Sequence, residues 1–193
     1  MKTTTNIMIV GVGGQGTLLA SRVLGNVLVG AGYDVKVSEV HGMSQRGGSV
    51  VTYVKYGEKV WSPIIGEGEA DIILAFEQLE AYRALPYVSK DGGMIIAGTQ
   101  CIDPMPVITG AAAYPADLSG KLAAKLGDRL DAFDALTPAQ KAGSSKAVNL
   151  VLMGRLAKYF DFTEEDWQAG IRASVPEKFL DMNLKAFAAG QQG

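Results

Sequence analysis

The chain has 193 residues, of which 48% are hydrophobic and 20% are charged, and its formal net charge at pH 7 is −2. These values fit one globular domain with an ample apolar core, and they exclude an intrinsically disordered chain. The near-neutral charge gives no electrostatic support for nucleic-acid binding. The single cysteine, Cys101, excludes an internal disulfide and also an iron–sulfur cluster or a thiolate zinc site built by this chain alone.

The start of the chain, MKTTTNIMIVGVGGQG, lacks the apolar stretch and the cleavage site of a signal peptide. No apolar run along the chain is long enough to cross a bilayer. We therefore expect a soluble, cytoplasmic protein without membrane contacts.

The first forty residues predict a strand, a helix and a second strand. Ile7–Val10 is an apolar run that ends in glycines. Residues 17–32 carry apolar side chains at helical spacing and end at Gly30 and Gly32, and residues 33–40 alternate valine with polar residues. This order forms a βαβ unit, which implies a parallel sheet with a right-handed crossover.

The middle of the chain predicts a hairpin and two buried strands. GSVVTYVKYG and EKVWSPII read as two strands joined at Gly57 and Glu58. ADIILAF and GGMIIAG are apolar runs typical of buried strands, with a helix between them. The loop-rich DPMPVITG that follows contains one predicted short strand, Val107–Ile108.

The last third of the chain predicts mainly helices. A short helix over LSGKLAAKLG comes first, followed by a last strand and a helix opened by Thr137 and Pro138. SSKAVNLVLMGRLAKYF is a strongly apolar helix. The next helix has Thr163 as its N-cap, and the final helix begins at Pro176 and closes at Gly190.

Gly11, Gly13 and Gly16 form G-x-G-x-x-G between a strand and a helix, which is the context that the dinucleotide-binding motif requires. The third glycine is expected to allow close packing of helix and strand. The N–H groups at the helix start would face an anion. We therefore predict a phosphate- or anion-binding turn made of Gly11, Gly13, Gly14, Gln15, Gly16 and Thr17.

The same motif also expects an acidic residue about 20 positions further on, which binds a ribose. The residue 20 positions after Gly16 is Lys36, and the nearest acids are Asp34 and Glu39. This mismatch leaves two interpretations open: a dinucleotide site, or a tight turn that binds nothing or a different ligand.

The stretch SEVHGMSQRGGSVV places many polar groups just past the carboxyl end of the second strand, where open α/β sheets bind ligands. Arg46 offers a planar fork for a carboxylate or phosphate, and the glycines allow backbone N–H groups to converge. The alternative is a loop whose polar groups cap its own backbone. We predict a substrate, coenzyme or partner interface made of His41, Ser44, Gln45, Arg46, Gly47, Gly48 and Ser49.

Four polar residues, including His41 of the predicted interface, each admit a structural role. His41 has no nearby Asp or Cys partner and so forms neither a triad nor a metal site. Glu77 and Glu80 begin a helix, where they either complement the helix dipole or contact a ligand or partner. Asn149 lies in an apolar helix and is expected to be a satisfied core residue. We assign no catalytic residue and no metal ligand.

Several segments together resemble the gamma component of the 2-oxoacid:ferredoxin oxidoreductases over nearly the whole chain. They are GVGGQG before a helix, EVHGMSQRGGSV, WSPIIGEGEADIILAFEQLEA, a GG strand and a late NLVLMG helix. The form GMSQRGGSV is most similar to the small (beta) subunit of the indolepyruvate ferredoxin oxidoreductases.

The resemblance implies oxidative decarboxylation of an aryl 2-oxoacid to its acyl-CoA, with electrons passed to ferredoxin. It implies that thiamine diphosphate, Mg and iron–sulfur clusters belong to a large partner subunit and that coenzyme A is a co-substrate. This chain alone would bind no cofactor and would be inactive. Ser44–Ser49 would line the face presented to the partner's active site, with Arg46 meeting a carboxylate or a coenzyme A phosphate.

We therefore expect a single α/β domain over residues 1–193. It would be a Rossmann-like three-layer sandwich with a mostly parallel sheet, an antiparallel hairpin and a helical C-terminal third. Two other functions remain open: a free-standing oxidoreductase that binds NAD or flavin through Gly11–Gly16, and a binding module without an enzymatic role.

Overall fold

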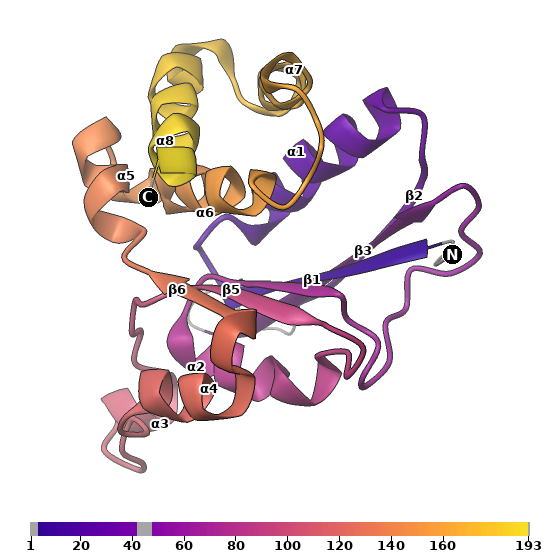
Figure 1. Cartoon of the computed structure of the whole chain (residues 1–193). Coiled ribbons are helices and arrows are strands. Elements are labelled where there is room, and N and C mark those ends of the chain that lie inside the picture. Colours follow the sequence, from indigo (N-terminus) through magenta and orange to yellow (C-terminus); the bar gives the residue numbers. More distant parts are fainter. Residues whose placement is uncertain (1–3, 42–47, 193) are drawn as a thin grey trace.

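The computed structural model describes residues 4–41 and 48–192, with only the backbone of His41 included. A six-stranded sheet in the order β2-β3-β1-β4-β5-β6 lies between helices on both faces (Figure 1). The strands are β1 (Thr4–Val12), β2 (Asp34–His41), β3 (Ser49–Gly57), β4 (Ile72–Ala75), β5 (Met94–Gly98) and β6 (Leu130–Phe133).

Two groups of helices lie on opposite sides of the sheet (Figure 1). One face carries α2 (Gln78–Ala84), the short α3 (Met105–Ile108) and α4 (Leu118–Leu126). The other face carries α1 (Thr17–Gly30), α5 (Leu136–Ala142), α6 (Val148–Ala157), α7 (Glu164–Ser174) and α8 (Leu180–Gln192).

The sheet is mostly parallel and contains an antiparallel hairpin, as the sequence predicts. β1, β4, β5 and β6 pair in parallel, whereas β3 runs antiparallel to both β1 and β2. The βαβ unit therefore has its two strands, β1 and β2, separated by β3.

The predicted partner of β3 is wrong: residues 58–65 form no strand, and the hairpin pairs β3 with β2. Both edges of β3 are occupied by β1 and β2, so no edge remains for a strand that follows it. Pro63 also lacks the N–H that a ladder needs. The predicted strand Val107–Ile108 is likewise wrong, because these residues end α3.

Central strand β1 divides the core into two layers. Ile7 and Ile9 face the α1 side, and Met8 and Val10 face the α2 side; all four are buried. A strand buried on both faces reads as a continuous apolar run, because both of its side-chain sets pack inward. This explains the run that predicts β1.

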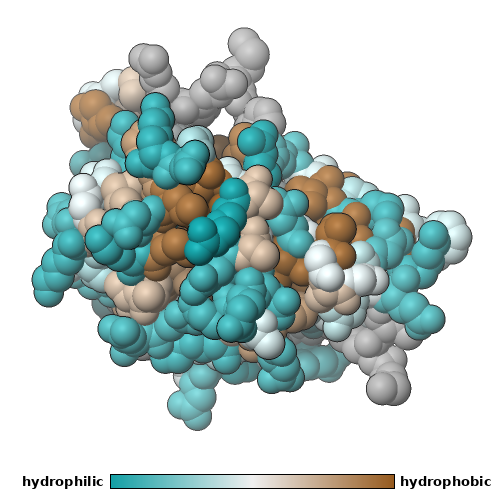
Figure 2. All heavy atoms as spheres, turned by 90° about the horizontal axis from the view of Figure 1, so that it is seen from above, coloured by the Kyte–Doolittle hydropathy of each residue, from teal (hydrophilic) through white to brown (hydrophobic). Residues whose placement is uncertain are grey.

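The helical C-terminal third adds a layer outside α1 and α6, where α7 and α8 pack (Figure 1). Thr163 is the N-cap of α7, as predicted, and it forms a capping box with Asp166. The view from above shows a largely hydrophilic surface with brown hydrophobic patches among the teal atoms (Figure 2). None of the helices in the described part of the chain has the length and apolar character needed to cross a membrane.

The two tryptophans have opposite environments. Trp167 is 1% exposed and packs among aromatic rings, including Phe187 with a centroid distance of 5.5 Å. Trp61 is 86% exposed, and the ammonium group of Lys59 lies 5.1 Å from its ring centroid.

Candidate functional site

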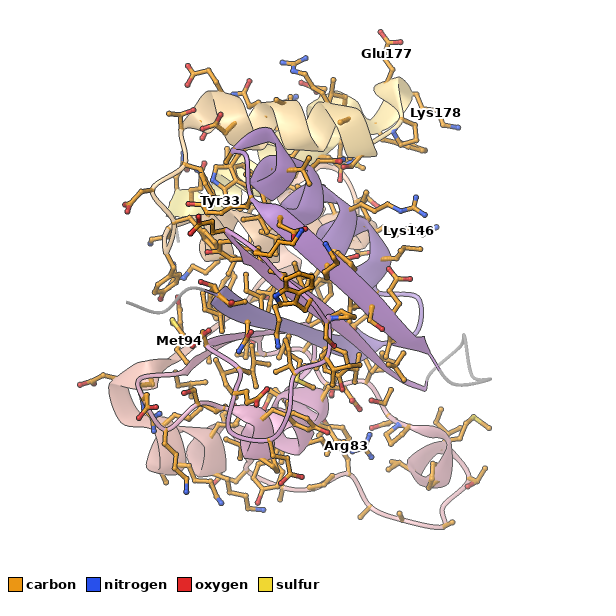
Figure 3. All side chains as sticks on the ribbon, turned by 90° about the vertical axis from the view of Figure 1, so that its right-hand side faces the viewer. Tyr33, Arg83, Met94, Lys146, Glu177 and Lys178 are labelled. Carbon is orange, nitrogen blue, oxygen red and sulfur yellow. The ribbon has the colours of Figure 1, made fainter. Side chains whose placement is uncertain are left out.

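The carboxyl ends of β1, β4 and β5 lie at one edge of the sheet, and β3 begins there because it runs antiparallel to β1. The backbone N–H of Gly13 donates to the carbonyl oxygen of Gly48 at 2.9 Å. The glycine turn and the end of the polar segment therefore meet at this edge, which we call the carboxyl edge. In Figure 3, Arg83 and Lys146 lie on the side toward which β2 points.

The backbone of the glycine turn requires glycine at two positions. Gly14 has a φ of 99° and Gly16 a φ of 84°, values that residues with a side chain rarely adopt. A Cβ on Gly16 would also lie 2.5 Å from Nδ2 of Asn149 in α6. The third glycine of the motif thus permits close packing of the turn on α6.

Asn149 is a satisfied core residue, as expected. It is 4% exposed, and its Oδ1 accepts from the N–H of Leu150 at 2.9 Å. Gln15 is also engaged within the chain. Its Oε1 accepts from the N–H of Val12 at 2.8 Å, and its Nε2 donates to the carbonyl oxygen of Phe76 at 3.1 Å. Gln15 therefore holds the ends of β1 and β4 together.

A cavity of about 320 Å³ opens beside the glycine turn, between α1 and the β2–β3 hairpin. The residues that line it are Gly13, Gly14, Gly16, Thr17, Leu18, Glu39, Val50 and Thr52.

Glu39 brings a carboxylate to this cavity, and its Oε1 accepts from the hydroxyl of Ser21 at 3.3 Å. The spacing of about 20 residues in the dinucleotide motif holds when the second strand lies beside the first. Here β3 separates them, which puts β2 about 10 Å from β1 at ordinary strand spacing. The spacing of the dinucleotide motif therefore leads to Lys36 and not to Glu39. For Thr52, the sequence shows only that it lies in a predicted strand.

The structure describes only part of the predicted polar segment. Ser44, Gln45, Arg46 and Gly47 lie outside the described residues, and His41 is described only as the last backbone position of β2. Gly48 and Ser49 lie at the carboxyl edge.

A buried carboxylate anchors the start of β3. The hydroxyl of Ser49 donates to Oε2 of Glu80, and Nη1 of Arg83 donates to Oε1 of Glu80 at 2.6 Å. Glu80 is 4% exposed, so these two donors supply what water would otherwise provide. The three side chains fix the exit of the polar segment against α2.

Glu77 holds the loop after β5 against α2. Its Oε2 accepts from the N–H of Glu80 at 2.9 Å, as the N-cap of the helix. Its Oε1 accepts from the N–H of Ile102 at 3.2 Å and from the hydroxyl of Tyr114. Burial, and then the Glu77 carboxylate, raise the pKa of the Tyr114 phenol. Because these donors occupy it, Glu77 has a structural role in this loop.

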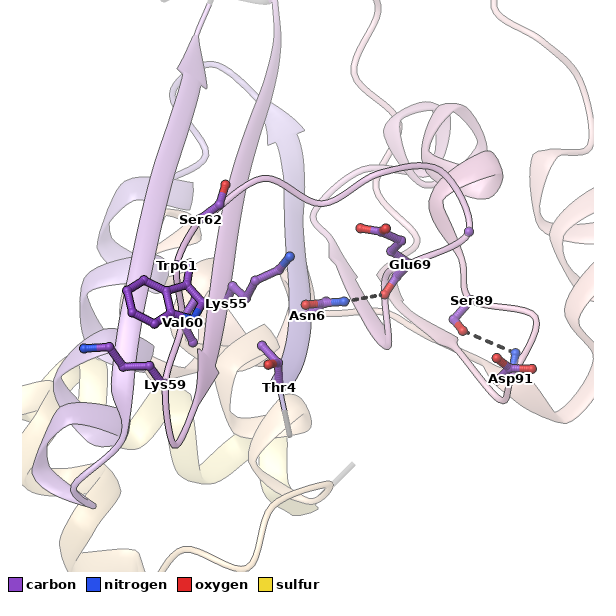
Figure 4. Close-up of a pocket in the computed structure, with 11 residues that line it drawn as sticks. Thr4, Asn6, Lys55, Lys59, Val60, Trp61, Ser62, Glu69, Ser89 and Asp91 are labelled. Atoms are coloured by element: carbon purple, nitrogen blue, oxygen red, sulfur yellow. Dashed lines mark hydrogen bonds between the residues drawn. The ribbon is translucent and has the colours of Figure 1, made fainter. Parts of the chain in front are cut away.

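A larger cavity, about 640 Å³, lies away from the carboxyl edge, near the amino end of β1 (Figure 4). Asn6 lies in it and donates through Nδ2 to the carbonyl oxygen of Glu69 at 2.8 Å, and exposed Trp61 forms part of its rim (Figure 4). Cavity volume alone therefore does not identify the edge where the glycine turn and the polar segment lie. Among the described residues, no three His, Cys, Asp or Glu side chains gather as metal ligands would.

Comparison with known proteins gives consistent matches along the chain. The family model described as "Pyruvate ferredoxin/flavodoxin oxidoreductase" matches residues 6–193. "Indolepyruvate oxidoreductase subunit IorB" of Thermococcus kodakarensis is 44% identical, over 96% of this chain and 93% of that protein. The protein of the same name from Pyrococcus horikoshii is 43% identical, over 96% and 93%.

The fold is also found among solved structures. The keto/oxoacid ferredoxin oxidoreductase gamma subunit from Geobacter sulfurreducens superimposes with a TM-score of 0.68 at 22% identity. The match covers 97% of this chain and 96% of that one, so the two share a complete fold.

Proposed function

The chain belongs to the pyruvate ferredoxin/flavodoxin oxidoreductase family, and from that membership we propose that it is the small subunit of a cytoplasmic indolepyruvate:ferredoxin oxidoreductase. The complex oxidatively decarboxylates an aryl 2-oxoacid in the presence of coenzyme A. The products are the acyl-CoA, carbon dioxide, one proton and two electrons, and the electrons reduce ferredoxin. Relatives named as subunits of indolepyruvate oxidoreductase, with identities up to 44%, support this substrate class.

In this proposal the large partner subunit holds thiamine diphosphate, Mg and the iron–sulfur clusters. Clusters of the common types need four thiolates, and this chain has one cysteine. Thiamine diphosphate supplies the carbanion stabilisation that decarboxylation needs. The chain itself contributes binding and orientation at its carboxyl edge, and we assign it no catalytic residue.

The observation that carries the proposal is the 44% identity, over 96% of this chain, to a protein named as an indolepyruvate oxidoreductase subunit. The hydrogen bond between Gly13 and Gly48 brings the glycine turn and the end of the polar segment to one edge, and it supports the interface that we propose there. The interface with substrate, coenzyme A or the partner's active site comprises His41, Ser44, Gln45, Arg46, Gly47, Gly48 and Ser49. Arg46 binds a carboxylate or a coenzyme A phosphate through its planar fork.

The proposal is tested by tagging the chain in its native host and purifying it without oxygen. A large partner that contains thiamine and iron–sulfur clusters should accompany it, and the mixture should reduce ferredoxin with indolepyruvate only when coenzyme A is present. A chain that purifies alone, or a complex inactive on aryl 2-oxoacids, would contradict the proposal.

Arg46→Ala is expected to lower coenzyme A-dependent turnover of the assembled complex at least tenfold. A hydrogen bond to a charged group contributes about 1.5–3 kcal/mol, and 1.4 kcal/mol corresponds to a factor of ten. The melting temperature of the chain should stay unchanged. Steady-state rates and coenzyme A KM values are measured beside Arg172→Ala, a control that removes an exposed arginine from α7. Unchanged turnover rates for Arg46→Ala would contradict the proposed contact of this residue with a carboxylate or a coenzyme A phosphate.

A further inference from the structure

We infer that the cavity near the amino end of β1 is a binding site for a free aromatic α-amino acid. The ligand's ammonium group would meet Asn6 and Glu69, its carboxylate would meet Lys55, and its ring would lie on Trp61; all four residues line the cavity. The inference rests on the proposed function only for the biological reason to bind such a ligand. Three properties of the cavity carry it.

Asn6 has a buried acceptor that lacks a donor. The residue is 8% exposed and lines the cavity. Its Nδ2 donates to the carbonyl oxygen of Glu69 at 2.8 Å, which orients the amide and turns Oδ1 to the side where Lys55 lies (Figure 4). In the described part of the chain, no donor is found for this oxygen. A buried acceptor without a donor is unfavourable, so a ligand that brings an N–H group to Asn6 would be stabilised.

Side chains of opposite charge line opposite sides of the cavity. Lys55 and Lys59 come from β3 and the segment after it, whereas Glu69 and Asp91 precede β4 and β5 (Figure 4). Lys55 donates to one backbone carbonyl at 2.7 Å, and Oε2 of Glu69 accepts from one backbone N–H at 2.8 Å. An ammonium has three donors and a carboxylate has two acceptor oxygens, so both retain capacity for a ligand. A ligand with a charge of each sign matches both sides.

Trp61 provides an aromatic surface at the rim of the cavity. Its side chain is 86% exposed, and the ammonium group of Lys59 lies 5.1 Å from the ring centroid, which leaves most of the indole uncovered. A second aromatic ring would pack on it in an offset-stacked or edge-to-face arrangement. The cavity volume of about 640 Å³ suffices for an amino acid with a side chain as large as that of tryptophan.

These groups distinguish an amino acid from the matching 2-oxoacid. The 2-oxoacid has a keto oxygen in place of the ammonium group, so it would leave Asn6 and Glu69 without a donor. In the proposed function the complex consumes aryl 2-oxoacids, and transfer of the amino group from an aromatic amino acid to another 2-oxoacid is the class of reaction that supplies them. The site would therefore let the complex respond to the amount of the amino acid from which its substrate forms.

The inference is tested by calorimetry of the full chain with L-tryptophan and with molecules that each lack one of its groups. Tryptamine lacks the carboxylate, 3-indolepropionate lacks the ammonium group, L-alanine lacks the ring, and indolepyruvate has the keto oxygen. L-Tryptophan should bind at least tenfold more tightly than each of them, because each loses a charge-assisted hydrogen bond or the aromatic contact. No binding of L-tryptophan, or equal affinity for L-tryptophan and 3-indolepropionate, would overturn the inference.

Two variants assign the contacts to residues. Glu69→Gln keeps an acceptor for the backbone N–H and should reduce the preference for L-tryptophan over 3-indolepropionate to a few-fold. Trp61→Ala should weaken L-tryptophan binding at least tenfold. Both residues are exposed, so the melting temperature should stay within about 2 °C of the wild type. Glu177→Gln removes an exposed acid from the C-terminal layer as a control and should change nothing. Wild-type ligand preference in Glu69→Gln or Trp61→Ala would contradict the site.

The same measurements separate a ligand site from a protein contact. If Trp61→Ala prevents association with the large subunit and the chain binds no amino acid, the cavity is a partner surface and the inference is wrong. Because binding is measured on the chain without its partner, the result stays valid if the purified complex fails to oxidise aryl 2-oxoacids. Failure of the proposed function and failure of this inference are therefore distinguishable.

Discussion

Gly154→Ala and Gly190→Ala are each expected to lower the free energy of unfolding by about 3 kcal/mol or more. α6 and α8 cross with their backbones in close contact. A Cβ on Gly154 would lie 2.0 Å from the carbonyl oxygen of Phe187, and a Cβ on Gly190 would lie 1.9 Å from that of Val151. Because the obstructing atoms are backbone, no side-chain rotation relieves the clash and the helices must separate.

The effect is measured by urea unfolding and by the melting temperature, which should fall by about 6–12 °C for a chain of this length. Gly25→Ala is the matched control, since it adds the same methyl group to a helix where nothing lies within 4 Å. It should stabilise the chain by about 0.5–1 kcal/mol. If either α6 or α8 variant unfolds like the wild type, the close crossing of these helices is incorrect.

Asp131→Asn is expected to cost about 3 kcal/mol, because it leaves the mostly buried guanidinium of Arg155 without its counter-charge. Nε and Nη2 of Arg155 donate to the two oxygens of Asp131 at 2.7 and 2.8 Å, and the hydroxyl of Tyr159 donates to Oδ2 at 2.8 Å. The Asp131 and Arg155 side chains are only 14% and 16% exposed. This pair fastens α6 to β6.

The same variant should change how stability depends on pH. Burial raises the pKa of Asp131, but hydrogen bonds from Arg155 and Tyr159 outweigh it, so the pKa lies below its usual range. A carboxyl whose pKa is lower in the folded state stabilises the fold above its unfolded pKa, about 3.9, and loses that contribution as the pH falls through the folded value. As the pH falls below about 4, the stability advantage of the wild type over Asp131→Asn should therefore shrink progressively.

Urea unfolding between pH 3 and pH 7 measures both effects. The controls are Arg155→Gln with the double variant, which give the coupling energy of the pair, and Asp181→Asn. Asp181 pairs with Lys185 at 2.7 Å, but both side chains are well exposed, at 84% and 65%. That variant should cost less than about 0.5 kcal/mol. Equal losses at Asp131 and Asp181 would show that burial does not strengthen the first pair.

The sequence predicts the helices and strands better than it predicts which strands pair with each other. The apolar run of β1, the helical spacing of α1 and the Thr163 cap are local signals, and the structure confirms all three. The pairing of β3 is a long-range property. β3 inserts antiparallel between β1 and β2, and this position depends on which strand edges remain free. Two neighbouring strand-like stretches in the sequence contain no information about those edges.

In the candidate site too, the sequence predicts local features but not the contacts between residues far apart in the chain. The glycine turn is visible in the sequence, but the reason for Gly16 includes Asn149, 133 residues further on. Ser49 is visible as one polar residue among several, whereas its anchor, Glu80, lies on another element. Glu39 reaches the cavity because an extra strand displaces β2, and no spacing rule derived from adjacent strands includes that displacement.

Because the two tryptophans lie in opposite environments, their intrinsic fluorescence reports on two different parts of the chain. An indole in water emits at longer wavelength than one packed among apolar rings, so Trp61 and Trp167 contribute to different parts of the fluorescence spectrum. Quenching or a blue shift limited to the long-wavelength component reports an event at the surface segment that contains Trp61. A red shift of the short-wavelength component reports opening of the aromatic layer around Trp167, so a single spectrum separates docking from unfolding.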